Sequence, residues 1–294
     1  MRSNEMWIYR FVVIMLSFAF SISAGKAQTP QPTPTPSASP TLERQFFKNI
    51  LLDQKAIWTA PFHLHSADAR WAAPLTLGTA ALIVSDQQTG DEIAEANGQL
   101  KASRIVSYAG SAYGVGAVTA GFYLFGRAKH DDRARETGIL GAEALVDSAI
   151  LVTAVKSITQ RTRPDGGRAR SDFFDGGSSF PSGHSISAWS LATVVANEYH
   201  DRRAVQIAAY GIATAVSISR FTGEKHYLSD ILVGSAMGYG IGRYVYHVHH
   251  RVGSSGGGEE EEGRLIERSR RWPAVTPVFD THAHSYGLGL GWSF

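Results

Sequence analysis

Between about residue 66 and residue 250, the chain alternates apolar segments rich in Ala, Gly and Ser with short polar turns. Each apolar segment is bounded by charged residues or by Gly, Pro or Asp, which are typical of helix ends. Few stretches favour strands, and the small side chains allow helix backbones to approach one another closely. The pattern predicts an all-α, close-packed bundle of about six helices, over residues 72–85, 101–128, 133–160, 183–199, 203–219 and 227–250.

The N-terminus carries the features of an export signal. Arg2 and Arg10 precede the twelve-residue apolar run FVVIMLSFAFSI, and the small residues of SAGKAQ follow it. A basic region, a short apolar core and a small-residue site are typical of a secretory signal peptide, so we predict that residues 1–27 are a signal cleaved after Ala27. The apolar run is short for a membrane span, and a retained anchor is the alternative.

Three further segments flank the predicted bundle, which we place at residues 66–250. Residues 28–41, QTPQPTPTPSASPT, form a Pro/Thr-rich spacer that cannot build a core. Residues 42–65 have apolar positions at helical spacing, and we expect an N-terminal helical segment there. Residues 251–271 contain the run GSSGGGEEEEG and are predicted to be an acidic, Gly-rich linker.

The last segment, residues 272–294, is predicted to be a short C-terminal β-hairpin. Its apolar residues alternate with Gly and Ser, the period-two pattern of a strand, at Leu288, Leu290, Trp292 and Phe294. One hairpin cannot close a barrel, so we expect a strand pair packed on the domain. The alternative is association with an outer membrane, because an apolar alternating strand ending in Phe resembles the last strand of bacterial outer-membrane β-barrels.

Composition excludes some classes of protein and leaves the relation to a membrane open. A net charge of +2 argues against nucleic acid as a partner, and the absence of Cys excludes disulfides and thiolate metal sites. The segment Ile105 to Gly126 has no charge over 22 residues, which is long enough to span a bilayer. Residues 137–155, however, contain Glu143 and Asp147, and the mean hydropathy of the chain is only −0.11. The sequence is therefore compatible with a membrane-embedded protein and equally with a soluble or peripheral one.

The stretch SRFTGEKHYLSD places His226 and Asp230 four residues apart. On a helix these side chains share a face, so the carboxylate can accept a hydrogen bond from one ring nitrogen and leave the other as a lone pair. That arrangement prepares a histidine as a nucleophile or a base. Arg220 in the same stretch is a fork-shaped donor suited to phosphate-like oxyanions.

Two upstream stretches supply the rest of an anion site. In KSITQRTRP, Lys156 and Arg163 stand seven residues apart, and we expect both on one face of a helix. In SSFPSGHS, Pro181 and Ser182 read as a helix start, where backbone N–H groups and the helix dipole favour anions. His184 would then lie beside the bound anion as a proton donor.

Together the stretches KSITQRTRP, PSGH and SRFTGEKHYLSD resemble the three-part motif of the type-2 phosphatidic acid phosphatase and vanadium haloperoxidase superfamily, with every fixed position matched in order. From this resemblance we expect residues 66–250 to adopt the helical-bundle fold of the superfamily. The resemblance also implies that His226 attacks phosphorus and forms a phosphohistidine, that Asp230 orients His226, and that His184 protonates the leaving oxygen. The residues implied to bind the phosphate are Lys156, Arg163, Ser182, Gly183 and Arg220. No metal is implied, since three cationic side chains take its place.

We therefore predict an exported, cell-envelope phosphatase of a bacterium, in the periplasm or a membrane, that hydrolyses phosphate monoesters or pyrophosphates, with lipids as the expected substrates and no cofactor. One alternative is a soluble, exported acid phosphatase of broad specificity that takes small phosphoesters. A second is a haloperoxidase with vanadate as its prosthetic group; in a phosphatase vanadate would be an inhibitor. A third is a non-enzymatic envelope protein that uses the bundle as a scaffold.

Overall fold

The computed structural model describes residues 42–63, 68–94, 99–164, 171–250, 274–280 and 285–291. The chain divides into two compact units, Met1–His249 and His250–Phe294, and each is described by itself. The predicted signal peptide, the Pro/Thr-rich spacer and the acidic linker lie outside the described residues and remain predictions.

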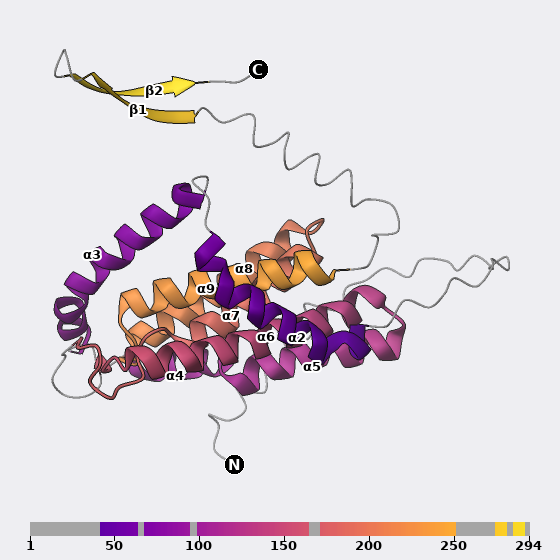
Figure 1. Ribbon diagram of the computed structural model, residues 1–294. Coiled ribbons are helices and arrows are strands. Elements are labelled where there is room, and N and C mark those ends of the chain that lie inside the picture. The colour runs from indigo at the N-terminus through magenta and orange to yellow at the C-terminus, as the bar shows by residue number, and fades with distance from the viewer. Residues whose placement is uncertain are drawn as a thin grey trace. The chain divides into compact units, whose positions relative to one another are not determined.

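The first unit is all-α, as predicted, apart from short 3-10 turns among its described residues (Figure 1). Its elements in chain order are α2 (Leu42–Thr59), η1 (Ala60–His63), α3 (Ala69–Ala94), α4 (Gln99–Ala109), α5 (Ala112–Lys129), α6 (Asp132–Thr159), α7 (Gly183–Glu198), α8 (Arg203–Thr222) and α9 (Leu228–His249).

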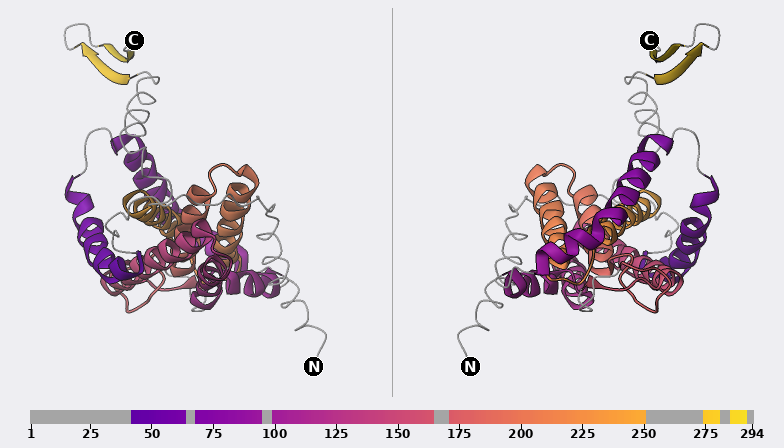
Figure 2. Two further views of the ribbon diagram at one scale, coloured as in Figure 1. Left: turned by 90° about the vertical axis from the view of Figure 1, so that its right-hand side faces the viewer. Right: turned by 90° about the vertical axis from the view of Figure 1, so that its left-hand side faces the viewer.

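Helix α7 is the centre of the bundle. It contacts α5, α6, α8 and α9, and most of its side chains are buried. The main apolar core lies between α6, α7 and α9, around the fully buried side chains of Leu140, Ile186, Val194 and Val245. Figure 2 shows α6 to α9 lying side by side from two directions, so the helices that carry the sequence motifs share one core.

Small residues on α9 let it lie directly on the backbone of α7. A Cβ added at Gly234, Gly238 or Gly242 would come within 2.7, 2.3 and 2.3 Å of the carbonyl oxygens of Ser182, Ile186 and Ser190. No side chain fits at such distances, so these three positions, one helical turn apart, require glycine. This stripe brings the start of α9 against the start of α7.

The prediction of one helix over residues 101–128 was wrong, because the chain breaks between α4 and α5. Ser111 is the N-cap of α5, and its hydroxyl accepts a hydrogen bond of 3.2 Å from the N–H of Gly114. At the break, Gly110 lies so close to α8 that an added Cβ would be 2.1 Å from a methyl group of Val216. The capping serine and this close approach end α4 where hydropathy alone indicates continuity.

Helix α2 is fastened across α6 and α9 by buried polar pairs. The Asn49 amide donates to Glu143 over 2.9 Å, and Gln54 donates to Asp147 over 2.9 Å. At the end of α9, the Nε2 of His249 lies 2.9 Å from a carboxylate oxygen of Asp53. The two acidic residues that seemed unsuited to a membrane helix are therefore partners of α2 in the interior.

Two of the described helices, α6 and α8, are long and apolar enough to cross a membrane by length and composition. Helix α8 turns much of its apolar surface outward, with Ile207 74% and Ile218 55% exposed. The second unit contains β1 (Ala274–Asp280) and β2 (Ser285–Gly291), which pair antiparallel with Ala274 opposite Gly291 and Asp280 opposite Ser285.

Candidate active site

The three sequence motifs meet at one end of the helices that carry them. Lys156 lies in the last turn of α6, His184 in the first turn of α7, Arg220 in the last turn of α8, and Asp230 in the first turn of α9. Arg163 and His226 lie in the loops that follow α6 and α8. The charges of Lys156, Arg163, Arg220 and His226 all act on His184, so the structure brings together the cations and both histidines.

The sequence had led us to expect Lys156 and Arg163 on one face of a helix. In the structure they do not share a helix. Helix α6 ends at Thr159, and its C-cap Gln160 takes a left-handed backbone conformation with φ of 44°. The two cations meet instead at Ser178. The Lys156 ammonium donates to the Ser178 carbonyl, and Arg163 Nη2 donates to the Ser178 hydroxyl over 3.3 Å.

Ser182 is buried and is the N-cap of α7. Its hydroxyl accepts a hydrogen bond of 3.4 Å from the N–H of Ser185, and the Ser185 hydroxyl lies 3.0 Å away. Gly183, the first residue of α7, is half-buried, and a Cβ there would contact the Lys156 side chain at 3.9 Å. Phosphate binding by Ser182 and Gly183 remains a prediction from the motif.

His226 and Asp230 form a buried pair. The Nδ1 of His226 lies 3.4 Å from Oδ2 of Asp230, and the two side chains are 2% and 0% exposed. This separation is longer than an ordinary hydrogen bond. Because Asp230 faces Nδ1, the Nε2 atom is the one left for chemistry.

The Asp230 carboxylate is held on both oxygens. Oδ1 accepts from Nη1 of Arg161 over 2.7 Å, while Oδ2 accepts from the Tyr227 backbone N–H over 3.0 Å and from the Ser179 hydroxyl. Burial alone raises the pKa of Asp230, but the adjacent His226 ring, the charge of Arg161 and the Ser179 hydroxyl together bring it below its ordinary value. Asp230 is therefore a carboxylate at neutral pH.

Both histidines are neutral at neutral pH. Burial lowers the pKa of His184 to about 3, and the nearby Arg220, His226, Arg163 and Lys156 side chains add to the decrease. Burial also lowers the pKa of His226 to about 4, with Asp230 opposing and Lys156 and Arg220 reinforcing the change. A neutral imidazole has a free lone pair, and here it lies beside several cations that would attract an anion.

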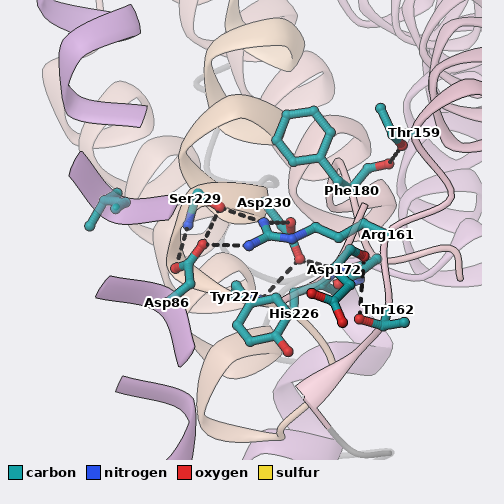
Figure 3. Close-up of polar contacts among 12 residues, drawn as sticks. Asp86, Thr159, Arg161, Thr162, Asp172, Phe180, His226, Tyr227, Ser229 and Asp230 are labelled. Atoms are coloured by element: carbon teal, nitrogen blue, oxygen red, sulfur yellow. Dashed lines mark hydrogen bonds and ion pairs between the residues drawn. The ribbon is translucent and has the colours of Figure 1, made fainter. Parts of the chain in front are cut away.

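Sequence reasoning missed the residues that hold Asp230. Arg161 is fully buried between Asp230 and Asp86 of α3, as Figure 3 shows. The available signal was a third cation inside KSITQRTRP, two residues before Arg163. Nothing in the sequence pattern linked it to Asp86, which precedes it by 75 positions.

One group of described side chains in the first unit has the composition of a metal site. Asp53, Glu143 and His249 place ligand atoms within 4.8 Å of one another. These side chains already have partners, since His249 pairs with Asp53 and Glu143 accepts from the Asn49 amide. The group includes no residue of the three motifs.

Comparison with known proteins identifies the domain. Residues 137–254 match the PAP2 superfamily, the phosphatidic acid phosphatase type 2 proteins, and this range contains every motif residue from Lys156 to Asp230. The chain is 34% identical over 129 residues to lipid A 1-phosphatase of Porphyromonas gingivalis. That match covers 44% of this chain and only 26% of the relative.

Two solved structures are also similar. The first is a transmembrane PAP2-type phosphatidylglycerolphosphate phosphatase from Bacillus subtilis, at 20% identity and a TM-score of 0.44, covering 70% of this chain and 94% of that one. The second is LpxE of Aquifex aeolicus, at 21% identity and a TM-score of 0.39, covering 49% of this chain and 83% of that one.

Proposed function

Starting from the PAP2 superfamily domain that residues 137–254 form, we propose that this chain is a metal-independent phosphatase acting on phosphate monoesters or pyrophosphates of lipids, through a phosphohistidine on His226. The observation that supports it most is the buried His226–Asp230 pair, which lies among the charges of Lys156, Arg163 and Arg220 with His184 beside it. A scaffold has no need of two neutral histidines among fixed cations.

In the first step, Nε2 of His226 attacks phosphorus and the bond from phosphorus to the leaving oxygen breaks. His184 gives its proton to that oxygen, so the oxygen of the departing alcohol or phosphate leaves as a hydroxyl group and carries no charge. The cations stabilise the charge that gathers on the equatorial oxygens in the transition state. Asp230 stabilises the positive charge that His226 acquires on forming the N–P bond.

In the second step, His184 is neutral and takes a proton from water, whose oxygen attacks phosphorus. The N–P bond breaks, inorganic phosphate is released, and His226 recovers its lone pair. His184 must be protonated before the first step, although burial and the nearby cations lower its pKa. A bound phosphate places negative charge among the cations and raises that pKa, so the substrate itself prepares the acid.

Lipid substrates are supported by two observations. The matched relative from Porphyromonas gingivalis is a lipid A 1-phosphatase. The bundle also exposes large apolar side chains, among them Tyr113 and Leu124 of α5 and Ile207 and Ile218 of α8. Such a surface suits contact with a membrane in which a lipid phosphate would be presented. We propose membrane association and, from the predicted signal peptide, an exported location.

The test is phosphate release by purified protein, wild type beside His226→Ala, on p-nitrophenyl phosphate, phosphatidic acid, lipid A and an isoprenoid pyrophosphate. We expect release that a chelator does not change, that vanadate inhibits, that favours the lipids and that His226→Ala abolishes. Equal rates on p-nitrophenyl phosphate would favour the broad-specificity phosphatase. Halide oxidation with added vanadate, without phosphate release, would favour the haloperoxidase, and neither activity in folded protein would favour the scaffold.

A further inference from the structure

Arg161 is the largest fully buried side chain among the described residues, and it joins two carboxylates from different helices. Its Nη1 donates to Oδ1 of Asp230 over 2.7 Å, and its Nη2 donates to Oδ2 of Asp86 over 2.9 Å. All three side chains are 0% exposed. A buried charge is tolerated only where it is paired and hydrogen-bonded, so each member depends on the others.

Two serines add further hydrogen bonds to this triad, although the buried Nε of Arg161 has no partner among the described residues. Ser229, next to Asp230, donates its hydroxyl and its backbone N–H to Asp86, and its hydroxyl accepts from Nη1 of Arg161 over 2.6 Å. The Arg161 carbonyl accepts from the N–H of Ser179 over 2.8 Å, and the hydroxyl of that same serine donates to Asp230. These contacts fix the Asp230 carboxylate in position and in plane (Figure 3).

Two aromatic rings hold the guanidinium from its faces. The Arg161 Cζ lies 4.5 Å from the ring centre of Tyr227 and 4.7 Å from that of Phe173. A planar cation stacked against rings and bonded at its edge to two carboxylates keeps one orientation. Phe173 reaches the triad from the loop between the first two motifs, and Tyr227 directly follows His226.

The charges of the triad do not cancel. Asp86 and Asp230 carry two negative charges and Arg161 carries one positive charge, which leaves one negative charge behind the His226 ring. Arg161 and Asp230 alone would form a neutral pair. Asp86 therefore keeps Asp230 effective as a partner for a histidine that becomes positive on attacking phosphorus. Asp86 belongs to α3 and lies outside the residues that match the family.

We propose that Asp86 and Arg161 are positioning residues for His226: they fix the Asp230 carboxylate opposite Nδ1 and keep a net negative charge behind the imidazole. The inference rests on the proposed function for its catalytic consequence. It also has a consequence in the resting protein, since Asp230 held in this way should keep the His226 proton on Nδ1 and the lone pair on Nε2.

Asp86→Asn tests the proposal because it removes the charge and keeps the shape. Asp53→Asn is the matched control, since Asp53 is also 0% exposed and also paired, but with His249 away from the triad. Two readouts are needed: kcat and KM on the best substrate, and the nitrogen chemical shifts of His226 at neutral pH in histidine-labelled protein. The His226 signal is assigned by its disappearance in His226→Gln.

We expect Asp86→Asn to lower kcat by about 100-fold with KM changed by less than about threefold, because a misplaced nucleophile weakens the transition state rather than substrate binding. The His226 shifts should change from a single Nδ1–H tautomer to a mixture of tautomers. Asp53→Asn should change neither readout. Wild-type kcat and shifts in folded Asp86→Asn, or equal changes in both variants, would overturn the proposal.

Ser229→Ala provides a milder second variant, should Asp86→Asn fail to fold. It removes one hydroxyl between Asp86 and Arg161 and leaves all charges in place. The same two readouts should move in the same direction by a smaller amount, and no movement would overturn the proposal. If the wild type itself releases no phosphate, the proposed function fails, while the tautomer of His226 still reports whether the triad positions it.

Discussion

The backbone N–H of Ser182 donates a hydrogen bond of 3.0 Å to the carbonyl oxygen of Asp230. This bond joins the start of α7, where the second motif lies, to the first turn of α9, where the third motif ends. The contact is possible because Gly234 lies against the Ser182 carbonyl with no room for a Cβ. The relative position of His184 and His226 therefore depends on how closely α9 packs on α7.

Gly238→Ala should destabilise the bundle. An added Cβ would lie 2.3 Å from the carbonyl oxygen of Ile186, and because that atom belongs to the backbone of a buried helix, the helices must separate. We expect a loss of about 1–3 kcal/mol in the free energy of unfolding, together with lower activity. Chemical denaturation and phosphate release measure the two effects.

Gly240→Ala is the control for that change. It lies on the same helix, and a Cβ there meets nothing within 4 Å. Since alanine is the better helix former, the free energy of unfolding should stay the same or rise by up to about 1 kcal/mol. If both variants lost the same stability, close packing of α9 on α7 would not be the cause.

His184→Gln should affect substrates according to their leaving groups. A general acid matters most when the departing oxygen is strongly basic, as in an alkyl phosphate, and least for p-nitrophenolate. We expect a loss of about 100-fold or more on the alkyl phosphate and a clearly smaller loss on p-nitrophenyl phosphate. Equal losses on the two substrates would argue that His184 binds phosphate and does not donate the proton.

The stability of the empty protein should fall as the pH falls from about 6.5 to about 4. Burial lowers the pKa of His226 from its ordinary value of 6.5 to about 4. In that interval the unfolded chain binds a proton at this position that the folded protein does not, so acid favours unfolding. The contribution of His226 to the free energy of unfolding is fully present above pH 6.5 and is lost progressively as the pH falls toward 4.

Denaturation curves measured across this pH range, for wild type and His226→Gln, test the sign and the size of that effect. Near pH 5 the wild type should lose about 1.4 kcal/mol per pH unit more than the variant, which corresponds to one proton. Parallel curves for the two proteins would show that His226 titrates normally in the folded state.

Much of this organisation could be predicted from the sequence, because the relevant signals are local. Ala/Gly-rich apolar segments with capped ends predict helices, and His226 and Asp230 stand within a single stretch of sequence. Contrary to expectation, the two do not share a helix face, since His226 lies in the loop before α9 and Asp230 in its first turn. The break at Gly110 could not be predicted from hydropathy, since it depends on contact with Val216 of α8. Helix ends set by distant packing have no signal in the local pattern.

The partners of Asp230 were missed for the same reason. No role was assigned to Arg161 from the sequence, yet this side chain is fully buried. Its burial depends on Asp86, which the fold brings to it from another helix. Pairing between distant charges is a property of the packed bundle, and a single sequence does not show it.

The central claim is that His226 carries the phosphoryl group during turnover. The most direct measurement is acid-free quenching of the wild type during reaction with a radiolabelled phosphate ester, followed by mapping of the labelled residue. We predict label on His226 that is lost in acid and retained in alkali, with no label and no phosphate release in folded His226→Ala. Undiminished phosphate release by His226→Ala, or label on another residue of the wild type, would contradict the account.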